Sequence, residues 1–584
     1  MCGIIGYNGT DNAIPYLVDG IENLEYRGYD SFGCAFDSSG KIAIKKDAGR
    51  VKDVLSKYPI DQVYSNRGIF HTRWATHGAV NRVNAHPLTD CTGEIAVVHN
   101  GIIENLDELK AMLKNHKFVS DTDTEVISHL IEEEVSKGSS MESAVKSTAA
   151  KLVGSSSFAV LSSRDNSVYA VKKGAPLVLG LAKSGTFVSS DVPSFLKYTN
   201  KVVFLHDGDV AVLKKNGYKI TNLYRKEPNH SVTMVKLSYE EVDKGRYHHY
   251  MIKEILEQPA LIKKLLDSGL PDIKKAAGLI NPSATVYLTG SGSSFYAATV
   301  GAYMMVKNGI KAMAIQSQDI PLYRRLMSNK DTIIIVSQSG ETADLINSLD
   351  SISGIKKIGL VNTKGSTLAN SVDYWLDMSA GQERGVAATK TFTTSAIMLT
   401  LLAYYTAGKE KEILPDLRLL SLNVYNIFVP SLYAAVDKVA AKLKNKENVF
   451  FIGRGIDYLS ALEASLKLKE VAYIHAEALD AAMFKHGPLA LVDRDLYVVS
   501  FMTKKNGPST SNNIDEIKSR SGKIIGISEE NDRAFDFFIR SQPAGAFSFI
   551  TQIIISQLLA YKVSVLKKID PDHPRNLAKS VTVK

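Results

Sequence analysis

Cysteine is scarce in this 584-residue chain, with three residues at positions 2, 34 and 91. Three scattered cysteines are too few for a disulfide framework or a cysteine-based zinc site. We therefore expect a protein of a reducing compartment that carries no metal site.

Long apolar runs are also lacking: the sequence has no stretch of about 18 apolar residues, the minimum for a membrane-spanning helix. The most apolar stretch, residues 547–566, is interrupted by Gln552, Ser556 and Gln557 and is expected to form a core helix. The opening MCGIIGYNGT has neither the basic nor the long apolar region of a signal peptide. The cytosol is the expected location, and no membrane contact is expected.

The net charge of +9 is not concentrated in one basic patch. The densest basic stretch, AKLKNKEN at residues 441–448, is short and contains an acidic residue. A nucleic-acid-binding face needs clustered basic residues. No nucleic acid is therefore expected, and small anionic substrates fit the charge as well.

Short β-type runs fill roughly the first 230 residues, among them IAVVHN at 95–100 and SFAVLSS at 157–163. Gly, Ser and Asp separate the runs, and helical patterns interrupt them near 14–24 and 123–135. This mixture predicts packed antiparallel sheets with helices on the outside, in a domain over residues 1–230.

The character of the sequence changes in a polar stretch that contains Pro228, Asn229 and a cluster of acidic residues. Such a stretch is typical of a linker, which we place at residues 231–246. Strand and helix patterns alternate beyond it, which predicts doubly wound parallel sheets.

The alternating part of the sequence repeats itself. Val286–Gly292 resembles Val449–Gly455, each before a predicted helix, at an offset of 163 residues. A repeat of this length indicates a duplicated domain. The predicted divisions are two α/β domains and a tail, at residues 247–415, 416–566 and 567–584.

Cys2 is a candidate nucleophile because of its position. A small second residue permits removal of Met1, which leaves the Cys2 thiol beside a free amino group that can act as a local base. From position alone, the favoured alternative is a small residue that opens the buried strand CGIIGY.

Polar blocks that packing does not require follow Cys2. They are Glu25–Ser31, His71–Gly78, His99–Asn105 and Ser120–Glu125, and each mixes charged, amide, hydroxyl or glycine residues. With Cys2, these blocks resemble the class II, N-terminal-nucleophile glutamine amidotransferases, over residues 2 to about 213. The resemblance implies an αββα sandwich of antiparallel sheets and L-glutamine as a substrate.

By this resemblance, Cys2 forms a glutamyl thioester, while the Asn100 side chain and the Gly101 N–H form the oxyanion hole. Arg73 is implied to hold the α-carboxylate of glutamine, and Asp123 its α-amino group. The other implied glutamine-site residues lie in a covering loop or near the nucleophile: Arg27, Trp74, Thr76, His77 and Gly78. Trp74 is either a core residue that anchors this loop or a hydrophobic gate for ammonia.

Residues 332–342, TIIIVSQSGET, form a predicted buried strand that ends in a hydroxyl-rich turn before a helix. Free N–H groups and three hydroxyls at this turn predict an anion site, whereas an ordinary helix cap needs one hydroxyl. Gly290–Ser294 is a similar turn and is a weak signal alone. Together the loops resemble sugar-isomerase (SIS) domains, although that family usually has Cys-Gly-Thr-Ser where this chain has Ser-Gly-Ser-Ser.

Glu463, Lys467 and Glu470 are spaced so that they share one face of a predicted helix. On spacing alone we expect a solvated stripe of ion pairs, because most apolar positions fall on the opposite side. His486, beyond this helix, would by itself more often be structural than functional.

A wider resemblance reverses this interpretation. Residues 453–488, with the tail PRNLAK at 574–579, resemble the glutamine–fructose-6-phosphate aminotransferases, and the resemblance covers nearly the whole chain. It implies that His486 opens the ring of D-fructose 6-phosphate and that Lys579 forms a Schiff base with its ketone. Glu470 is then implied to move a proton from C1 to C2, which gives glucosamine 6-phosphate without a metal or organic cofactor.

Two departures from the family pattern are Met483, where an acidic residue is expected, and Lys584, where a terminal glutamate is common. They bear on the support of His486 and on the docking of the tail. The duplicated domain suggests a homodimer whose sites are completed across subunits. The implied phosphosugar contacts are Ser293, Ser294, Ser337, Gln338, Ser339, Thr342, Val386, Lys467 and Ala578.

Other functions share parts of the pattern. Amidophosphoribosyltransferases and asparagine synthetases have a similar first domain, but the phosphosugar repeat and the lack of an adenylating motif argue against both. A non-enzymatic sugar-phosphate sensor would need neither Cys2 nor Lys579.

Overall fold

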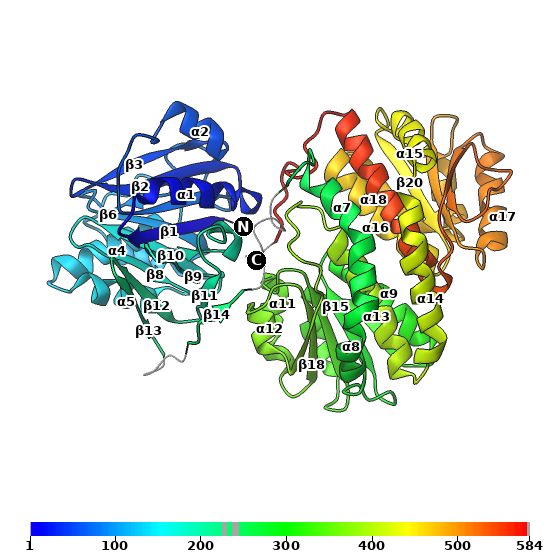
Figure 1. Cartoon of the computed structure of the whole chain (residues 1–584), viewed down its shortest axis with the longest axis horizontal. Coiled ribbons are helices and arrows are strands. Elements are labelled where there is room, and N and C mark those ends of the chain that lie inside the picture. The colour runs from blue at the N-terminus through cyan, green and yellow to red at the C-terminus, as the bar shows by residue number, and fades with distance from the viewer. Residues whose placement is uncertain (1, 225–229, 236–243, 581–584) are drawn as a thin grey trace. The chain divides into compact units, whose positions relative to one another are not determined.

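The computed structural model describes residues 2–224, 230–235 and 244–580. The chain forms two compact units, one of residues 1–243 with 578–584 and one of residues 244–577 (Figure 1). The linker predicted at 231–246 lies partly outside the described residues, as do Met1 and Lys584.

The first unit is mainly β-structure. Its strands are β1 (Gly3–Gly9), β2 (Ser31–Ser38), β3 (Lys41–Ala48), β4 (Arg67–Arg73), β5 (Leu88–Thr89), β6 (Ile95–Gly101), β7 (Ser156–Ser162), β8 (Val168–Val171), β9 (Val178–Leu181), β10 (Gly185–Ser189), β11 (Lys201–Phe204), β12 (Asp209–Lys214), β13 (Gly217–Asn222) and β14 (Thr233–Met234). Its helices are α1 (Ala13–Glu22), α2 (Val51–Lys57), α3 (Leu106–Met112), α4 (Glu125–Ser136) and α5 (Met141–Lys151). Within the described residues, the strands pair into antiparallel sheets in the orders β14-β11-β9-β10-β1-β4-β2-β3 and β13-β12-β8-β7-β6-β5.

The alternation of side chains along β1 shows how these sheets are layered. Ile5 packs with Leu17 of α1 on the outer face of the first sheet. Its neighbour Ile4 points the other way and packs with Ala159 of the second sheet. On the far face of the second sheet, Val160 packs against α4 and α5. The layers therefore run helix, sheet, sheet, helix, which confirms the predicted αββα sandwich.

The second unit alternates strands and helices. Its strands are β15 (Val286–Gly290), β16 (Ala312–Gln316), β17 (Thr332–Ser337), β18 (Lys356–Val361), β19 (Tyr374–Asp377), β20 (Asn448–Gly453), β21 (His475–Asp480), β22 (Tyr497–Met502), β23 (Lys523–Ser528) and β24 (Phe537–Arg540). Its helices are α7 (Tyr250–Lys264), α8 (Leu270–Ala277), α9 (Ser293–Lys307), α10 (Ile320–Tyr323), α11 (Ala343–Ser348), α12 (Thr367–Ser371), α13 (Lys390–Thr406), α14 (Glu410–Asn423), α15 (Pro430–Leu443), α16 (Ile456–Ala472), α17 (Gly507–Lys518) and α18 (Ser548–Leu566).

These strands form parallel sheets in the orders β16-β15-β17-β18-β19 and β21-β20-β22-β23-β24. In each sheet the first strand in sequence lies between the second and the third, so the strand order reverses beside it. In open α/β sheets, ligands bind at this switch point, outside the carboxyl ends of the strands. Buried residues on both faces of each sheet pack against helices, which confirms the doubly wound architecture.

The internal repeat is visible in the backbone. Gly292 and Gly455, which directly precede α9 and α16, have φ angles of 57° and 55°. An added Cβ at Gly290 or Gly453 would come within 2.7 or 2.4 Å of the backbone of the following helix. Both pairs keep the offset of 163 residues because each helix starts tightly against the end of its strand.

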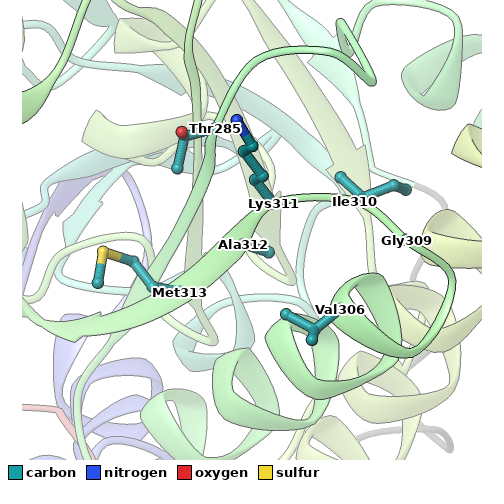
Figure 2. Close-up of a pocket in the computed structure, with 7 residues that line it drawn as sticks. All are labelled: Thr285, Val306, Gly309, Ile310, Lys311, Ala312 and Met313. Carbon is teal, nitrogen blue, oxygen red and sulfur yellow. The ribbon is translucent and has the colours of Figure 1, made fainter.

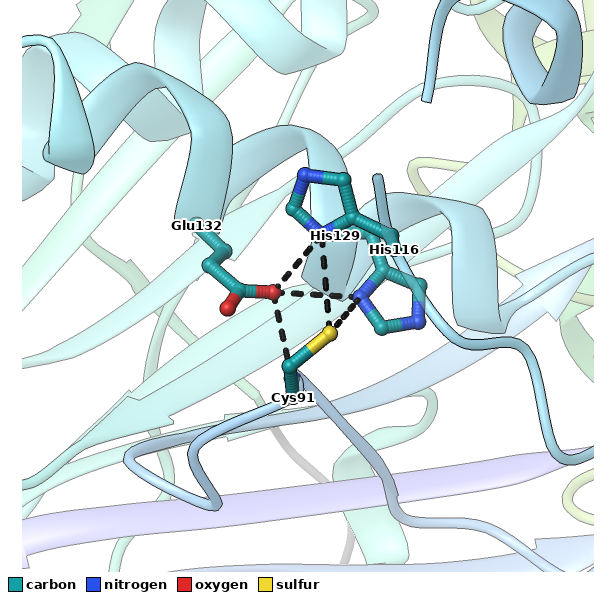
Figure 3. Close-up of side chains that lie close together, drawn as sticks. All are labelled: Cys91, His116, His129 and Glu132. Atoms are coloured by element: carbon teal, nitrogen blue, oxygen red, sulfur yellow. Dashed lines mark hydrogen bonds and ion pairs between the residues drawn. The ribbon is translucent and has the colours of Figure 1, made fainter. Parts of the chain in front are cut away.

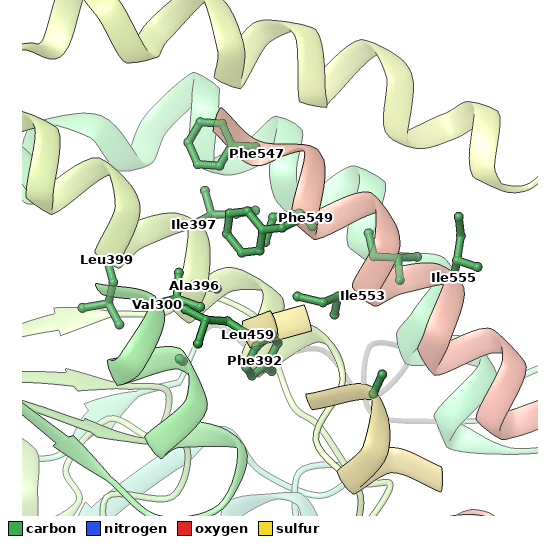
Figure 4. Packing of buried hydrophobic residues seen from close by; sticks show 14 of the residues in the cluster. Val300, Phe392, Ala396, Ile397, Leu399, Leu459, Phe547, Phe549, Ile553 and Ile555 are labelled. Carbon is green, nitrogen blue, oxygen red and sulfur yellow. The ribbon is translucent and has the colours of Figure 1, made fainter. Parts of the chain in front are cut away.

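One apolar core joins the two repeats. It includes Val300 of α9, Phe392 of α13, Leu459 of α16 and Phe549 of α18 (Figure 4). By length and apolarity the stretch Gly545–Leu566 could cross a membrane, but 83% of its most apolar window is buried inside the structure. The prediction of a core helix at this position is confirmed.

Candidate active sites

The Cys2 thiol lies against the backbone of the predicted covering loop. The Trp74 N–H donates a hydrogen bond to Cys2 Sγ at 3.2 Å. Burial raises the pKa of the Cys2 thiol, while the hydrogen bond from Trp74 and the charge of Arg73 act in the opposite direction. The thiol thus has cationic and N–H partners that favour the nucleophilic thiolate.

Asn100 is held with its amide nitrogen toward Cys2. Its Nδ2 donates to the Cys2 carbonyl and to Ser190 Oγ, both at 3.0 Å. Burial lowers the pKa of His71 to about 3, so its ring is neutral near pH 7. His71 Nε2 lies 3.2 Å from the His99 carbonyl, which can only accept, so this nitrogen carries the proton. The same Nε2 donates to Asn100 Oδ1 at 3.1 Å and thereby fixes the amide orientation.

Gly101 directly follows Asn100 at the end of β6. Its φ is 143°, and an added Cβ would lie 1.9 Å from the Ser155 carbonyl oxygen. Only glycine fits this position, so the backbone beside Asn100 is tightly defined.

Arg73 is buried, and its guanidinium is only partly satisfied. Nη2 donates to the His77 carbonyl, whereas Nη1 has no hydrogen-bond partner among the described residues. Burial lowers the pKa of Arg73, and the nearby Cys2, Asp30 and Asp123 raise it. An unsatisfied buried N–H is costly, so this nitrogen is suited to an anionic group that enters the site.

Arg27 and Asp123 are anchored on either side of this group. Arg27 Nε lies 3.4 Å from the Cys2 carbonyl, and its Nη1 pairs with Asp191 at 3.3 Å. Asp123 accepts from the Ile103 N–H at 2.9 Å. The structure therefore brings these predicted glutamine-site residues together with Cys2 and Asn100.

The predicted covering loop is largely open to solvent. Trp74 is half-buried and packs edge-on against Tyr29, with ring centroids 5.9 Å apart. The following residues Thr76, His77 and Gly78 are exposed. Trp74 is therefore not a fully buried core residue.

In the second unit, Lys467 is the centre of a buried polar cluster. Its Nζ lies 3.1 Å from Ser293 Oγ, 3.4 Å from Glu463 Oε1 and 2.5 Å from Glu470 Oε2. The side chains of Lys467 and Glu463 are 0% and 1% exposed. The solvated stripe that spacing alone favoured is therefore wrong, because α9, α18 and β21 pack around α16 and cover its charged face.

Charge in this cluster is finely balanced. Burial raises the pKa of Glu463 to about 7. Burial acts to lower the pKa of Lys467, but Glu463 and Glu470 outweigh it and raise that pKa. A permanently charged lysine beside a carboxyl group that titrates near neutrality is typical of acid–base sites.

The predicted anion loop follows β17. Ser337 Oγ accepts from the Gly340 N–H at 3.0 Å and lies 3.3 Å from Thr342 Oγ1. Ser339 Oγ accepts from the Glu341 N–H at 3.1 Å. Because β17 pairs in parallel with β15, this loop and the Gly290–Ser294 turn lie at the switch point of the first parallel sheet. Gln338 lies within the same loop.

The corresponding position in the second repeat contains its own carboxylate. Asp457 stands where the first repeat has Ser294, at the same offset of 163 residues. Asp457 Oδ2 accepts from the Thr503 N–H at 3.0 Å and from Asn506 Nδ2 at 2.9 Å. An internal anion therefore uses these donors, which leaves the first repeat as the better phosphate site.

Other predicted residues are not brought to this cluster within the second unit. His486 ends a short 3₁₀ helix with an exposed side chain and makes no hydrogen bond or ion pair in the part of the chain that the structure describes. The Val386 N–H donates to the Asp572 carbonyl at 3.2 Å. Ala578 and Lys579 group with the first unit, so their place beside Glu470 stays a prediction.

Sequence reasoning missed Glu383. This buried carboxylate accepts from the Thr389 N–H at 2.9 Å and from Thr391 Oγ1 at 2.7 Å, at the start of α13. Its charge also acts on Lys467. Glu383 lies in an irregular segment without periodicity, so only a charged residue beside glycines could have marked it.

A surface pocket of about 460 Å³ lies elsewhere in the second unit (Figure 2). It is lined by Thr285, Val306, Gly309, Ile310, Lys311, Ala312 and Met313. Thr285 precedes β15 and Lys311 precedes β16, so the pocket lies at the amino ends of these strands. Ligands of such sheets bind at the carboxyl ends, and the pocket is therefore not the candidate site.

Known proteins resemble this chain over its full length. The glutamine amidotransferase domain family matches residues 71–197, and the SIS domain family matches residues 279–405 and 442–565. Proteins named glutamine–fructose-6-phosphate aminotransferase [isomerizing] from Pyrococcus horikoshii and Thermococcus kodakarensis are 42% and 41% identical, over 100% of both chains in each comparison. The solved C-terminal domain of the glucosamine-fructose-6-phosphate aminotransferase from Francisella tularensis is 29% identical, with a TM-score of 0.53, and covers 57% of this chain and 100% of that domain. This chain belongs to the glutamine–fructose-6-phosphate aminotransferase (isomerizing) family.

Proposed function

We propose that this chain transfers the amide nitrogen of L-glutamine to D-fructose 6-phosphate and isomerises the product to glucosamine 6-phosphate, with release of glutamate. The observation that carries the proposal is the unsatisfied Nη1 of buried Arg73 beside the Cys2 thiol. That nitrogen fits the α-carboxylate of an amino-acid substrate, and Asp123 supplies the opposite charge for its α-amino group. The expected compartment is the cytosol.

In the glutaminase half, Cys2 Sγ attacks the amide carbon, and a thioester forms as ammonia leaves. After removal of Met1, the α-amino group of Cys2 takes the thiol proton and returns it to the leaving nitrogen. Asn100 Nδ2 and the Gly101 N–H donate to the developing oxyanion. Asn100 must first give up one of its hydrogen bonds to the Cys2 carbonyl or Ser190. Water then hydrolyses the thioester to glutamate.

In the sugar half, the hydroxyls of the loop at residues 337–342 and of Ser293 and Ser294 receive the phosphate and the sugar. His486 opens the ring, and the Lys579 amine forms an imine with the ketone carbon. Ammonia displaces Lys579, and Glu470 carries a proton from C1 to C2. No metal or organic cofactor takes part, because the imine accepts the electron pair released at C1.

We also propose a homodimer. His486 is exposed, and its ring is available to reach the sugar site of a second copy. Lys467 has a positioning role, because its Nζ holds Glu470 Oε2 at 2.5 Å.

Product analysis tests the proposal. The purified chain is incubated with glutamine and fructose 6-phosphate, and the products are identified by mass. We expect glucosamine 6-phosphate and glutamate together. The Cys2→Ala variant, with Met1 still removed, should release no glutamate. Absence of the amino sugar from an active glutaminase would contradict the proposal.

A further inference from the structure

A cluster of metal-binding side chains lies in the first unit and plays no part in the proposed reaction (Figure 3). Cys91 lies in the turn between β5 and β6, His116 in the loop after α3, and His129 and Glu132 on α4. One ligand atom from each of these four residues lies within 4.8 Å of the other three. We call this group the Cys91 cluster.

The distances in the Cys91 cluster fit a tetrahedral metal ion. Cys91 Sγ lies 3.6 Å from His116 Nδ1 and 3.6 Å from His129 Nδ1. Glu132 Oε2 lies 3.0 Å from His116 Nδ1 and 3.1 Å from His129 Nδ1. Zinc bonds of about 2.3 Å to sulfur and about 2.0 Å to nitrogen and oxygen place tetrahedral ligand atoms about 3.3–3.6 Å apart. The side chains therefore need almost no movement to bind zinc.

The outward-facing ring nitrogens support the same assignment. His116 Nε2 lies 3.2 Å from Glu133 Oε2, and His129 Nε2 lies 3.6 Å from Glu125 Oε1. Both histidines thus present Nδ1 to the cluster and Nε2 to a carboxylate. Zinc-binding histidines usually have such a carboxylate on the second nitrogen, because it fixes the tautomer and the ring orientation.

We propose that Cys91, His116, His129 and Glu132 bind one zinc ion. Four protein ligands close the coordination sphere, so the ion is structural and ties a β-turn and a loop to α4. The site also connects to the glutamine site, because Glu125 accepts from the Ser120 N–H at 2.7 Å, in the segment that carries Asp123. This proposal replaces the expectation, drawn from the cysteine count, that the chain carries no metal.

Metal analysis of the full chain tests the proposal. The protein is purified without an affinity tag or chelator, and zinc is measured by mass spectrometry. We expect about one zinc per chain, and a loss of most of it in Cys91→Ser and in His129→Gln. The matched control is His475→Gln, an exposed histidine of the second unit, which should keep the full zinc content.

A spectroscopic arm covers metal loss during purification and variants that fold poorly. The wild-type chain is stripped with a chelator and titrated with Co²⁺ alone. We expect tetrahedral Co²⁺ bands and a thiolate-to-metal charge-transfer band, with the latter absent in Cys91→Ser. The proposal is overturned if the wild-type chain gives no such spectrum, or if Cys91→Ser keeps the charge-transfer band. A metal-free network of imidazolium–carboxylate pairs would give the first of these results.

Discussion

Lys467 Nζ lies 2.5 Å from Glu470 Oε2, and the lysine side chain is fully buried. An ammonium group is tolerated in a protein interior only where carboxylates pair with it. Here Glu463 provides a second carboxylate at 3.4 Å. The same contacts therefore affect both the stability of the second unit and the position of the proposed proton carrier.

Replacing Lys467 by methionine should destabilise the second unit by about 3–5 kcal/mol, because Glu463 is left buried without its cation. Denaturant unfolding of the full chain, followed through the transition of the second unit, measures this change. Lys504→Met is the control, since the ion pair of Lys504 with Glu530 is exposed and should contribute less than about 1 kcal/mol. Equal effects of the two substitutions would contradict the account, and adding Glu463→Gln to Lys467→Met should restore part of the loss.

Glu463 should make stability depend on pH. Its pKa is about 7 in the folded chain, against an ordinary value of 4.5, so the folded state binds the extra proton between these values. The free energy of unfolding should therefore fall as pH rises from 4.5 to 7, by at most a few kcal/mol. Glu463→Gln should remove this slope, whereas Glu530→Gln should keep it. A slope that is unchanged in Glu463→Gln would show that the group is not buried as described.

Arg73→Lys should weaken glutamine binding, because a lysine has no second N–H in the fork geometry that grips a carboxylate. The loss of one charge-assisted hydrogen bond, about 1.5–3 kcal/mol, corresponds to a rise in KM for glutamine of about 10- to 100-fold. Steady-state glutaminase kinetics measure it, with exposed Arg82→Lys as the matched control. A KM equal to that of the control would remove Arg73 from the glutamine site.

Trp74→Ala should uncouple the two reactions. Ammonia that meets water at neutral pH is protonated and lost as a nucleophile, so a half-buried aromatic ring beside Cys2 can limit this loss. We expect much of the glutaminase activity to remain, while less glucosamine 6-phosphate forms per glutamate under saturating substrates. Trp74→Phe should keep more of the coupling. If the ratio stays at the wild-type value in Trp74→Ala, with folding intact by circular dichroism, Trp74 does not gate ammonia.

The sequence was sufficient for the architecture because its signals are local. The glycines at 290 and 453 mark a strand that runs straight into a helix, and their equal spacing from the following motifs exposed the repeat. The predicted core helix at 547–566 needed only its apolar composition. The order of strands in each sheet, by contrast, depends on tertiary packing and was found only in the structure.

Burial of the charged face of α16 could not be predicted in this way. Helical spacing places Glu463 and Lys467 on one face, but it does not show that other elements cover that face. The Cys91 cluster was missed for a related reason. Its ligands come from a turn, a loop and a helix between residues 91 and 132, without a local motif.

Transfer of labelled nitrogen tests the central claim most directly. The chain is given fructose 6-phosphate and glutamine carrying ¹⁵N in the amide, in a buffer that contains unlabelled ammonium. The account predicts glucosamine 6-phosphate that carries ¹⁵N, formed together with glutamate, and no labelled product from Cys2→Ala. Glutamate release without an amino sugar, or an amino sugar that carries only unlabelled nitrogen, would contradict it.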